Sequence, residues 1–213
     1  MFSKQKVLAW VVVILAIIAA LIWWSRKSEG DVSGQVSAEM QNWKEFVSPN
    51  NQFSTLLPTL PQHASDAVPL PLGQGIIKYD MYMSQEKDGT TFMISTIQYP
   101  PDFKITSPQD LYDNVVKELV AGNAHNKLKY SEKAFYEEYP ALDFLIENSA
   151  MAIKTKTFLV DRTLYILTLL DRTPLDVDQH FTRYASAFHL LKAPAVCPPE
   201  APVQEETNKT ESK

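Results

Sequence analysis

Histidine and cysteine often bind metal ions or transfer protons, and this chain contains few of them. Its 213 residues include four histidines and a single cysteine, Cys197. A zinc site takes several such ligands at short spacings, and the sequence has no His-x-x-x-His pair. His180 and His189 lie in a segment predicted to be helical, where their spacing puts them on opposite sides. We therefore predict no metal site, no cofactor and no catalytic residue.

Catalytic and nucleotide-binding motifs built on glycine are also missing. The six glycines form neither a phosphate-binding turn between a strand and a helix nor a Gly-x-Ser-x-Gly nucleophile elbow. A single cysteine excludes an intrachain disulfide. The fold must therefore depend on its hydrophobic core.

Two carboxylates could form an acid–base pair. Asp143 and Glu147 lie on one face of a predicted strand, at residues 141–147. The next predicted strand carries Lys154 and Lys156, so cross-strand ion pairs on a solvated face are the simpler interpretation.

Five lysines form the most basic surface that the sequence predicts. If their strand is regular, Lys127, Lys129 and Lys133 share one face, and Lys154 and Lys156 lie on a nearby strand. Such a surface could bind anionic lipid or an acidic partner. Lysines also protect exposed sheet edges, so protection of an edge is the alternative to a binding surface.

A second candidate binding segment is the loop at residues 68–75. It combines Leu70 and Leu72 with two prolines, which favours either a packed lid or a small docking surface. We predict the five lysines and these two leucines as partner-binding residues.

The overall charge argues against nucleic-acid binding. The formal net charge is -5, and no dense stripe of lysine and arginine is present. Nucleic-acid affinity depends on displacing counterions with such a stripe. We therefore exclude nucleic acid as a partner.

Residues 7–24 are apolar and uncharged, follow a short flank at residues 1–6, and predict a transmembrane signal anchor. As a helix this run would span about 27 Å, close to the thickness of the hydrocarbon core. Trp23 and Trp24 precede Arg26 and Lys27, an order typical of a membrane interface. A cleaved signal peptide is the alternative. We expect a single-pass protein with its domain outside the cytoplasm, on the periplasmic side of the inner membrane if the source is bacterial; the opposite topology is the other possibility.

The remaining chain divides into three parts. Residues 25–39 are small and polar and predict a flexible tether, while residues 193–213 are rich in proline and glutamate and predict a disordered tail. Residues 40–192 contain enough apolar side chains for one domain.

Within this domain, local patterns predict strands followed by a helix, a strand meander and a second helix. Ser107-Pro108 predicts the beginning of a helix that ends at Gly122. Thr173-Pro174 predicts the beginning of a second helix that continues to Leu191. The predicted strands are residues 43–48, 53–57, 77–83, 91–99, 128–134, 141–147, 152–160 and 164–170. This order predicts an α+β fold: an antiparallel β-sheet with helices packed on it, an α-β-α sandwich preceded by one transmembrane helix.

Several short segments resemble the PsbP-like fold. They include Phe-Ser-Thr-Leu-Leu-Pro at 53–58, Tyr-Pro-Ala at 139–141 and Ala-Ser-Ala-Phe-His-Leu-Leu at 185–191. This group contains extrinsic photosystem proteins, a Ran-binding protein and many bacterial envelope proteins. The resemblance implies an α-β-α sandwich that binds a partner without catalysis, and no functional residue carries over.

We therefore expect a membrane-anchored protein-binding or assembly module, held in the membrane by residues 7–24, whose partner is another envelope protein. The alternative is a small enzyme or ligand-binding protein with a site between helix and sheet.

Overall fold

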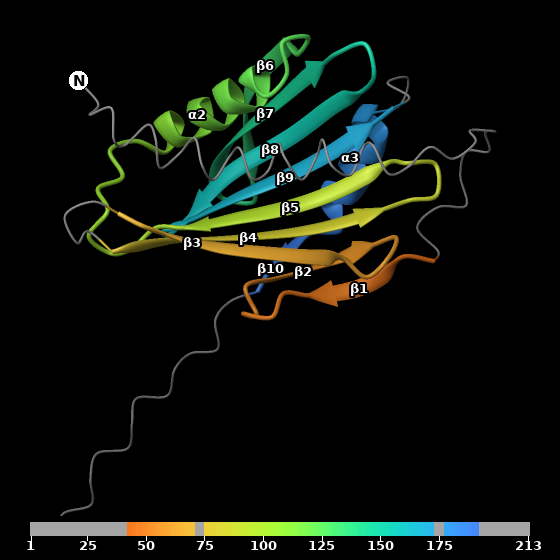
Figure 1. Cartoon of the computed structure of the whole chain (residues 1–213). Helices are drawn as coiled ribbons and strands as arrows, with labels where there is room; N and C mark the ends of the chain where they lie inside the picture. The colour runs from red at the N-terminus through yellow and green to blue at the C-terminus, as the bar shows by residue number, and fades with distance from the viewer. Residues whose placement is uncertain (1–41, 71–74, 173–176, 192–213) are drawn as a thin grey trace, which may run out of the picture.

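The computed structural model describes residues 42–70, 75–172 and 177–191, all within the predicted domain (Figure 1). The predicted anchor, tether and tail lie outside these residues. In the described ranges, no helix has both the length and the apolar character that a membrane span requires.

The described chain forms an α+β fold dominated by a seven-stranded antiparallel sheet. The strands, in spatial order, are β3 (Gln62–Pro69), β4 (Ile76–Gln85), β5 (Thr91–Gln98), β9 (Thr163–Asp171), β8 (Ala152–Val160), β7 (Tyr139–Glu147) and β6 (Lys127–Tyr136). Each neighbouring pair is antiparallel. The predicted class and the antiparallel meander are therefore confirmed.

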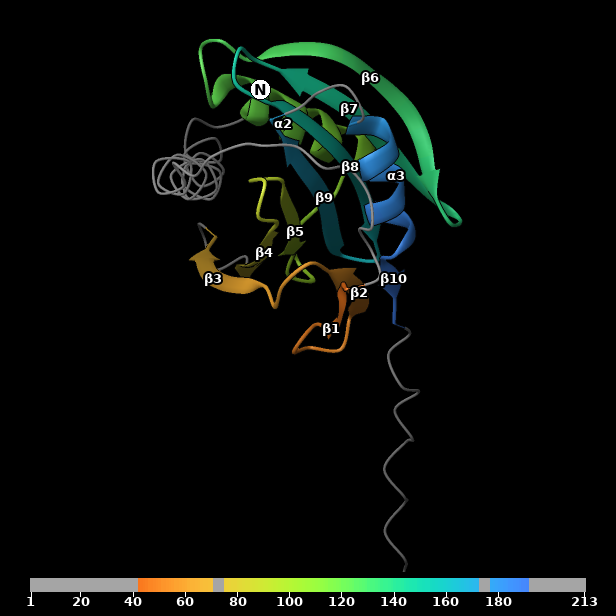
Figure 2. The same ribbon diagram turned by 90° about the vertical axis from the view of Figure 1, so that its right-hand side faces the viewer.

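Two helices contact opposite faces of this sheet (Figure 2). Helix α2 (Pro108–Ala121) packs on β7 and β8, where side chains such as Phe144 and Ile146 form one core. Helix α3 (Val177–Ser186) packs on β8 and β9 and shares the other core with Phe158 and Leu167. The two cores arise because alternate residues of a strand point to opposite faces.

Helix α2 begins and ends where its sequence predicts. The Ser107 side chain accepts a hydrogen bond from the backbone N–H of Gln109 at 3.2 Å, and Pro108 occupies the first turn. Gly122 is the C-cap residue. These local signals stabilise the ends of the helix, while its buried face attaches it to the sheet.

A second, smaller sheet contains β1 (Lys44–Val47), β2 (Phe53–Leu57) and β10 (His189–Leu190), in the order β1-β2-β10. The hairpin of β1 and β2 matches its prediction, whereas β10 does not. Helix α3 ends at Ser186, and Phe188 then stacks on Phe53 with ring centroids 5.1 Å apart. The prediction of one helix extending to Leu191 was therefore wrong, because His189 and Leu190 form a strand that pairs with β2.

Strand β3 was not predicted. Residues 62–67 are exposed and carry no alternation of apolar and polar side chains, so periodicity could not reveal them. Val68 and Pro69, which we assigned to a loop, belong to this strand. Pairing with β4, rather than burial, defines it.

Candidate functional site

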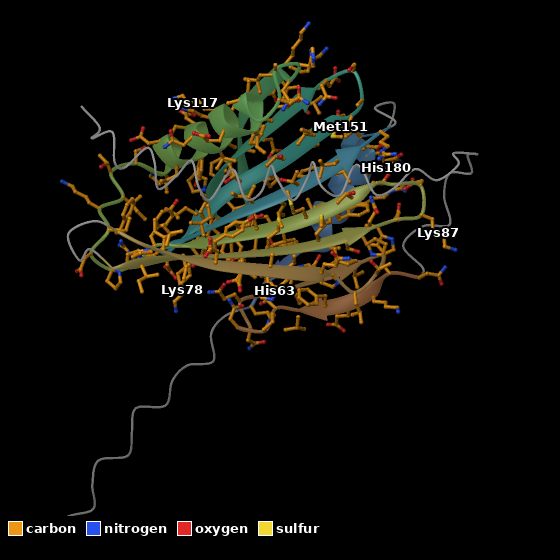
Figure 3. All side chains as sticks on the ribbon, viewed as in Figure 1. His63, Lys78, Lys87, Lys117, Met151 and His180 are labelled. Atoms are coloured by element: carbon orange, nitrogen blue, oxygen red, sulfur yellow. The ribbon has the colours of Figure 1, made fainter. Side chains whose placement is uncertain are left out.

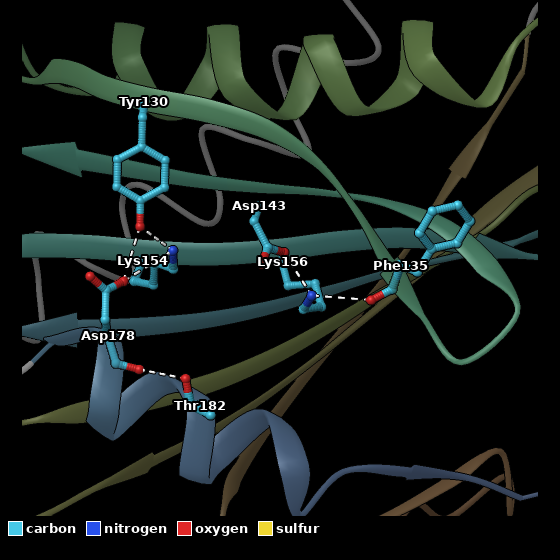
Figure 4. Close-up of polar contacts among 7 residues, drawn as sticks. All are labelled: Tyr130, Phe135, Asp143, Lys154, Lys156, Asp178 and Thr182. Carbon is cyan, nitrogen blue, oxygen red and sulfur yellow. Dashed lines mark hydrogen bonds and ion pairs between the residues drawn. The ribbon is translucent and has the colours of Figure 1, made fainter.

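Lys154 and Lys156 do not lie on an open basic surface. Both project from β8 toward the face that carries α3, where they contact groups from β6, β7 and α3 (Figure 4). Only 7% of Lys154 is exposed. The two lysines therefore do not form part of an open basic surface, because the sheet face on which they lie is covered.

Lys154 is the centre of a closed polar triangle with Tyr130 and Asp178. Its ammonium donates a hydrogen bond to the Tyr130 hydroxyl and lies 3.2 Å from Oδ1 of Asp178. The Tyr130 hydroxyl in turn donates to the same Asp178 oxygen at 3.0 Å. The three groups therefore satisfy one another's charge and hydrogen bonds.

Both titratable donors of this triangle have a raised pKa and stay protonated. Burial favours the neutral form of Lys154, but the Tyr130 hydroxyl and the Asp178 carboxylate outweigh burial and raise its pKa. Burial also raises the pKa of Tyr130. A nucleophilic or proton-abstracting lysine needs a lowered pKa, so the arrangement is that of a stabilising contact between strand and helix.

Lys156 forms a separate pair with β7. Its ammonium lies 2.9 Å from Oδ1 of Asp143 and donates to the backbone carbonyl of Phe135 at 3.3 Å. Asp143 and Lys156 are directly opposed in the register of β7 and β8. The predicted cross-strand ion pair is confirmed here, whereas Glu147 pairs with Lys129 at 3.1 Å instead of with Lys154.

The remaining lysines are on β6, at the edge of the sheet, and they do not share one face. A β-bulge between Leu128 and Tyr130 interrupts the register with β7. Lys127 therefore lies opposite Glu147, whereas Lys133 lies opposite Leu142, whose side chain belongs to the core under α2. The predicted alignment was wrong, because an extra residue in a bulge reverses the alternation beyond it.

The predicted apolar docking segment is only partly described. Leu70 packs against the core on the α2 side, and its N–H donates to the carbonyl of Gly75 at 2.8 Å. Leu72 lies outside the described residues. The described leucine is thus part of the fold rather than an open contact.

Strand β6 presents the most exposed aromatic side chain among the large apolar residues described. Phe135 is 70% exposed, and Leu128 on the same strand is also exposed. Leu128 lies opposite Ile146, and Phe135 lies opposite Pro140, as Lys133 lies opposite Leu142. All three side chains are therefore on the α2 face of the sheet, and together they make an amphipathic row that we call the β6 face.

Two histidines form pairs with aspartates in separate places (Figure 3). His63 Nε2 lies 2.8 Å from Oδ1 of Asp80, and its ring stacks on Tyr82 with centroids 4.6 Å apart. His180 Nδ1 lies 3.1 Å from Oδ2 of the buried Asp171. No group of three or more potential metal ligands occurs within the described ranges.

His189 is in β10 rather than on the same helix as His180. The expectation that both lie on opposite sides of one helix was therefore wrong. The helix stops before His189, where the chain pairs with β2.

Comparison with solved structures gives a resemblance of fold. The cyanobacterial PsbP protein CyanoP from Synechocystis sp. PCC 6803, solved in solution, matches with a TM-score of 0.48 and 13% identity, over 76% of this chain and 98% of that chain. PA94 from Pseudomonas aeruginosa, a protein of unknown function, matches with a TM-score of 0.33 and 12% identity, over 68% and 93% of the two chains. The resemblance to the PsbP-like fold is weak. It transfers no site and no activity.

No protein-family model and no curated protein sequence matches the chain.

The sequence did not indicate which residues contact Lys154. Tyr130 and Asp178 are 48 positions apart, and they meet only because β6 curves toward α3. Neither spacing nor residue type indicates that contact. The exposed Phe135 was missed because an isolated aromatic residue in an alternating strand resembles a core residue.

Proposed function

We propose that this chain is a single-pass membrane protein whose α+β domain binds another protein of the cell envelope and does not catalyse a reaction. The observation that carries the proposal is the 70% exposure of Phe135 on the outermost strand of a well-packed sheet. Burying an aromatic ring of this kind in an interface is favourable, and aromatic residues are enriched in interfaces.

The chemistry of the partner follows from the neighbours of Phe135. Lys133 lies on the same face, and Leu128 adds a second exposed apolar group there. About 23 Å separates Leu128 from Phe135 at the usual rise of a strand. We expect a partner surface that combines apolar side chains with carboxylates over that length.

The two lysines of β8 form ion pairs with aspartates, which supports binding rather than catalysis. Lys154 is protonated and paired with Asp178, and Lys156 is paired with Asp143. Neither ammonium is left to activate a substrate. The basic groups of β6, Lys127 and Lys133, are the two predicted lysines that remain exposed without an ion pair among the described residues.

Photo-crosslinking tests the β6 face. A benzoylphenylalanine residue replaces Phe135 in the full chain, expressed in its own cells, and the same residue replaces Val47, which is 45% exposed on β1, as a matched control. We expect a covalent adduct with another protein at position 135 and none at 47. Combining the probe with Lys133→Glu, on the same face as Phe135, should abolish the adduct, since this change opposes an acidic partner.

Equal adducts at positions 135 and 47, or an adduct unchanged by charge reversal, would show that the β6 face has no specific partner. A folded variant with normal circular dichroism that yields no adduct at 135 would have the same meaning.

The proposed location has its own test. Residues 7–24 anchor the chain in the membrane, and the domain lies outside the cytoplasm. An epitope placed after Lys213 should be removed by protease added to intact spheroplasts, while a cytoplasmic marker stays intact. Protection of the epitope until lysis would place the domain in the cytoplasm and refute this topology.

A further inference from the structure

The two edges of the seven-stranded sheet differ in how well they resist pairing. Edge strand β6 carries three lysines and a β-bulge, and both features obstruct the addition of another strand. The other edge, β3, contains no lysine or arginine, and its register with β4 is uninterrupted from Gln62 to Pro69. Strand β3 is therefore the unprotected edge.

Strand β3 is also accessible along its length. Residues 62–67 are all exposed, and β4 is its one neighbour among the described strands. Ala64, Ser65 and Ala67 have small side chains that let a second backbone approach. The larger His63 leans on β4, where it stacks on Tyr82 and contacts Asp80, so it does not block the edge (Figure 3).

We propose that β3 pairs antiparallel with β3 of a second copy of this chain, so that the two sheets continue into one another across a two-fold axis at Ser65. Directly opposed residues of an antiparallel pair share a face, so an axis perpendicular to the sheet must pass beside one residue and its own copy. This condition leaves few registers.

The axis at Ser65 gives the best of these registers. Ala64 then lies opposite Asp66 of the partner subunit, and His63 lies opposite the partner's Ala67. An axis at Asp66 would oppose two identical carboxylates, which is destabilising. An axis at Ala64 would shorten the paired segment, because Pro61 ends the strand on one side.

The prolines at the two ends of β3 support a second copy of β3 as the strand that pairs with it. Pro61 and Pro69 are equally spaced on either side of Ser65. Proline has no N–H to donate to a neighbouring strand, so both ends of the pairing segment are defined. In the proposed register Pro69 meets the partner's Pro61. Between them, the N–H of Ala67 donates to Oδ1 of Asp66 at 2.7 Å, and pairing exchanges this bond for one across the two strands. Because the two prolines are equally distant from Ser65, two antiparallel copies centred on Ser65 begin and end their pairing at the same positions.

The interface would be small. A single strand pair of this length lies near or below the roughly 1,000 Å² at which protein interfaces become stable. We therefore expect a dimer whose population rises with concentration over the micromolar range.

Disulfide trapping tests the register in the full chain, purified in detergent. Cys197→Ser removes the only cysteine, and Ser65→Cys then places one thiol beside the proposed axis. Directly opposed residues in an antiparallel pair have Cα atoms about 4.5–5.5 Å apart, which suits a disulfide. The matched control is Ser131→Cys in the same background, since Ser131 is an exposed serine in the middle of the protected edge β6.

We expect mild oxidation to link the Ser65→Cys chain into a dimer at least tenfold faster than the Ser131→Cys chain. Light scattering on the cysteine-free chain should show a mass that doubles with concentration, and adding Ala67→Lys should keep it monomeric with unchanged circular dichroism.

Equal crosslinking of the two cysteine variants would overturn the proposal, as would a monomeric mass at every concentration. A dimer that persists with Ala67→Lys would also overturn it, because the two copies would then associate elsewhere. If Ser65→Cys crosslinked in cells to a different protein rather than to a second copy, β3 would be a docking edge for that protein and the two-fold pairing would be wrong.

Discussion

At the scale of single residues, the polar triangle of Lys154, Tyr130 and Asp178 shows how one sheet position can look functional in the sequence and be structural in the fold. The two charged members are buried unequally: the side chain of Lys154 is 8% exposed, whereas that of Asp178 is 70% exposed. Removing one charge therefore has different consequences for the two residues, because only Lys154 would be left as a charge without access to water.

We predict that Asp178→Ala destabilises the domain more than Lys154→Met. The first change leaves a buried ammonium with Tyr130 as its remaining partner, which should lower the free energy of unfolding by about 2–3 kcal/mol. Methionine keeps the apolar stem of Lys154, and water can hydrate the remaining Asp178 carboxylate, so we expect a loss under about 1 kcal/mol. Urea unfolding measures both changes.

The variant that combines Asp178→Ala with Lys154→Met no longer has the buried ammonium, so it should recover most of the stability lost in Asp178→Ala alone. Lys129→Met, which breaks the exposed pair with Glu147, is the control and should change stability by less than about 0.5 kcal/mol. An Asp178→Ala variant as stable as the parent would mean that the triangle does not hold α3 to the sheet.

At the scale of elements, helix α2 combines strong local signals with a buried face. Its N-terminus has a serine cap followed by proline, and its inward side contributes Leu111, Tyr112, Val115 and Leu119 to the core. The Tyr112 hydroxyl also joins two strands, donating to the carbonyl of Pro140 at 2.9 Å and accepting from the N–H of Leu159 at 3.0 Å. Local sequence therefore sets where the helix begins, and packing sets where it lies.

We predict that Ser107→Ala lowers the free energy of unfolding by about 1 kcal/mol, since the N–H of Gln109 then loses its acceptor. Ser107→Asp retains an acceptor and adds a favourable charge at the helix N-terminus, so it should stay within about 0.5 kcal/mol of the parent. Urea denaturation followed by circular dichroism distinguishes the two. Equal stability of the alanine and aspartate variants would show that the cap contributes nothing.

At the scale of the whole molecule, buried tyrosines are distributed over both cores, and they make stability depend on alkaline pH. Burial raises the pKa of Tyr82 and of Tyr165 to about 12 and pushes those of Tyr79, Tyr99 and Tyr184 further up. An unfolded tyrosine ionises near pH 10. Between these values the unfolded chain releases protons that the folded chain retains.

We therefore predict that the domain keeps its full stability below about pH 10 and loses it progressively as the pH rises toward 12. Urea midpoints measured at intervals from pH 8 to pH 12 should show this fall. Tyr165→Phe removes one titrating group and should make the fall less steep. A midpoint that does not change across this range would contradict the buried positions of these hydroxyls.

The sequence by itself determined the features that depend on neighbours along the chain. The cap at Ser107, the proline that follows it and the order of short strand segments along the chain were sufficient to predict the first helix, the strand meander and the antiparallel class. These patterns are local, because a backbone turn or a strand face is set by a few consecutive residues.

Only the tertiary structure decided which side chains meet and which edges stay open. The bulge in β6 moved Lys127 and Lys133 to different faces, the contact between Tyr130 and Asp178 enclosed Lys154, and pairing with β4 made a strand of exposed residues in β3. Each of these outcomes depends on the spatial relation of segments that are distant in sequence. Register, curvature and packing set that relation, and no short stretch of residues encodes them.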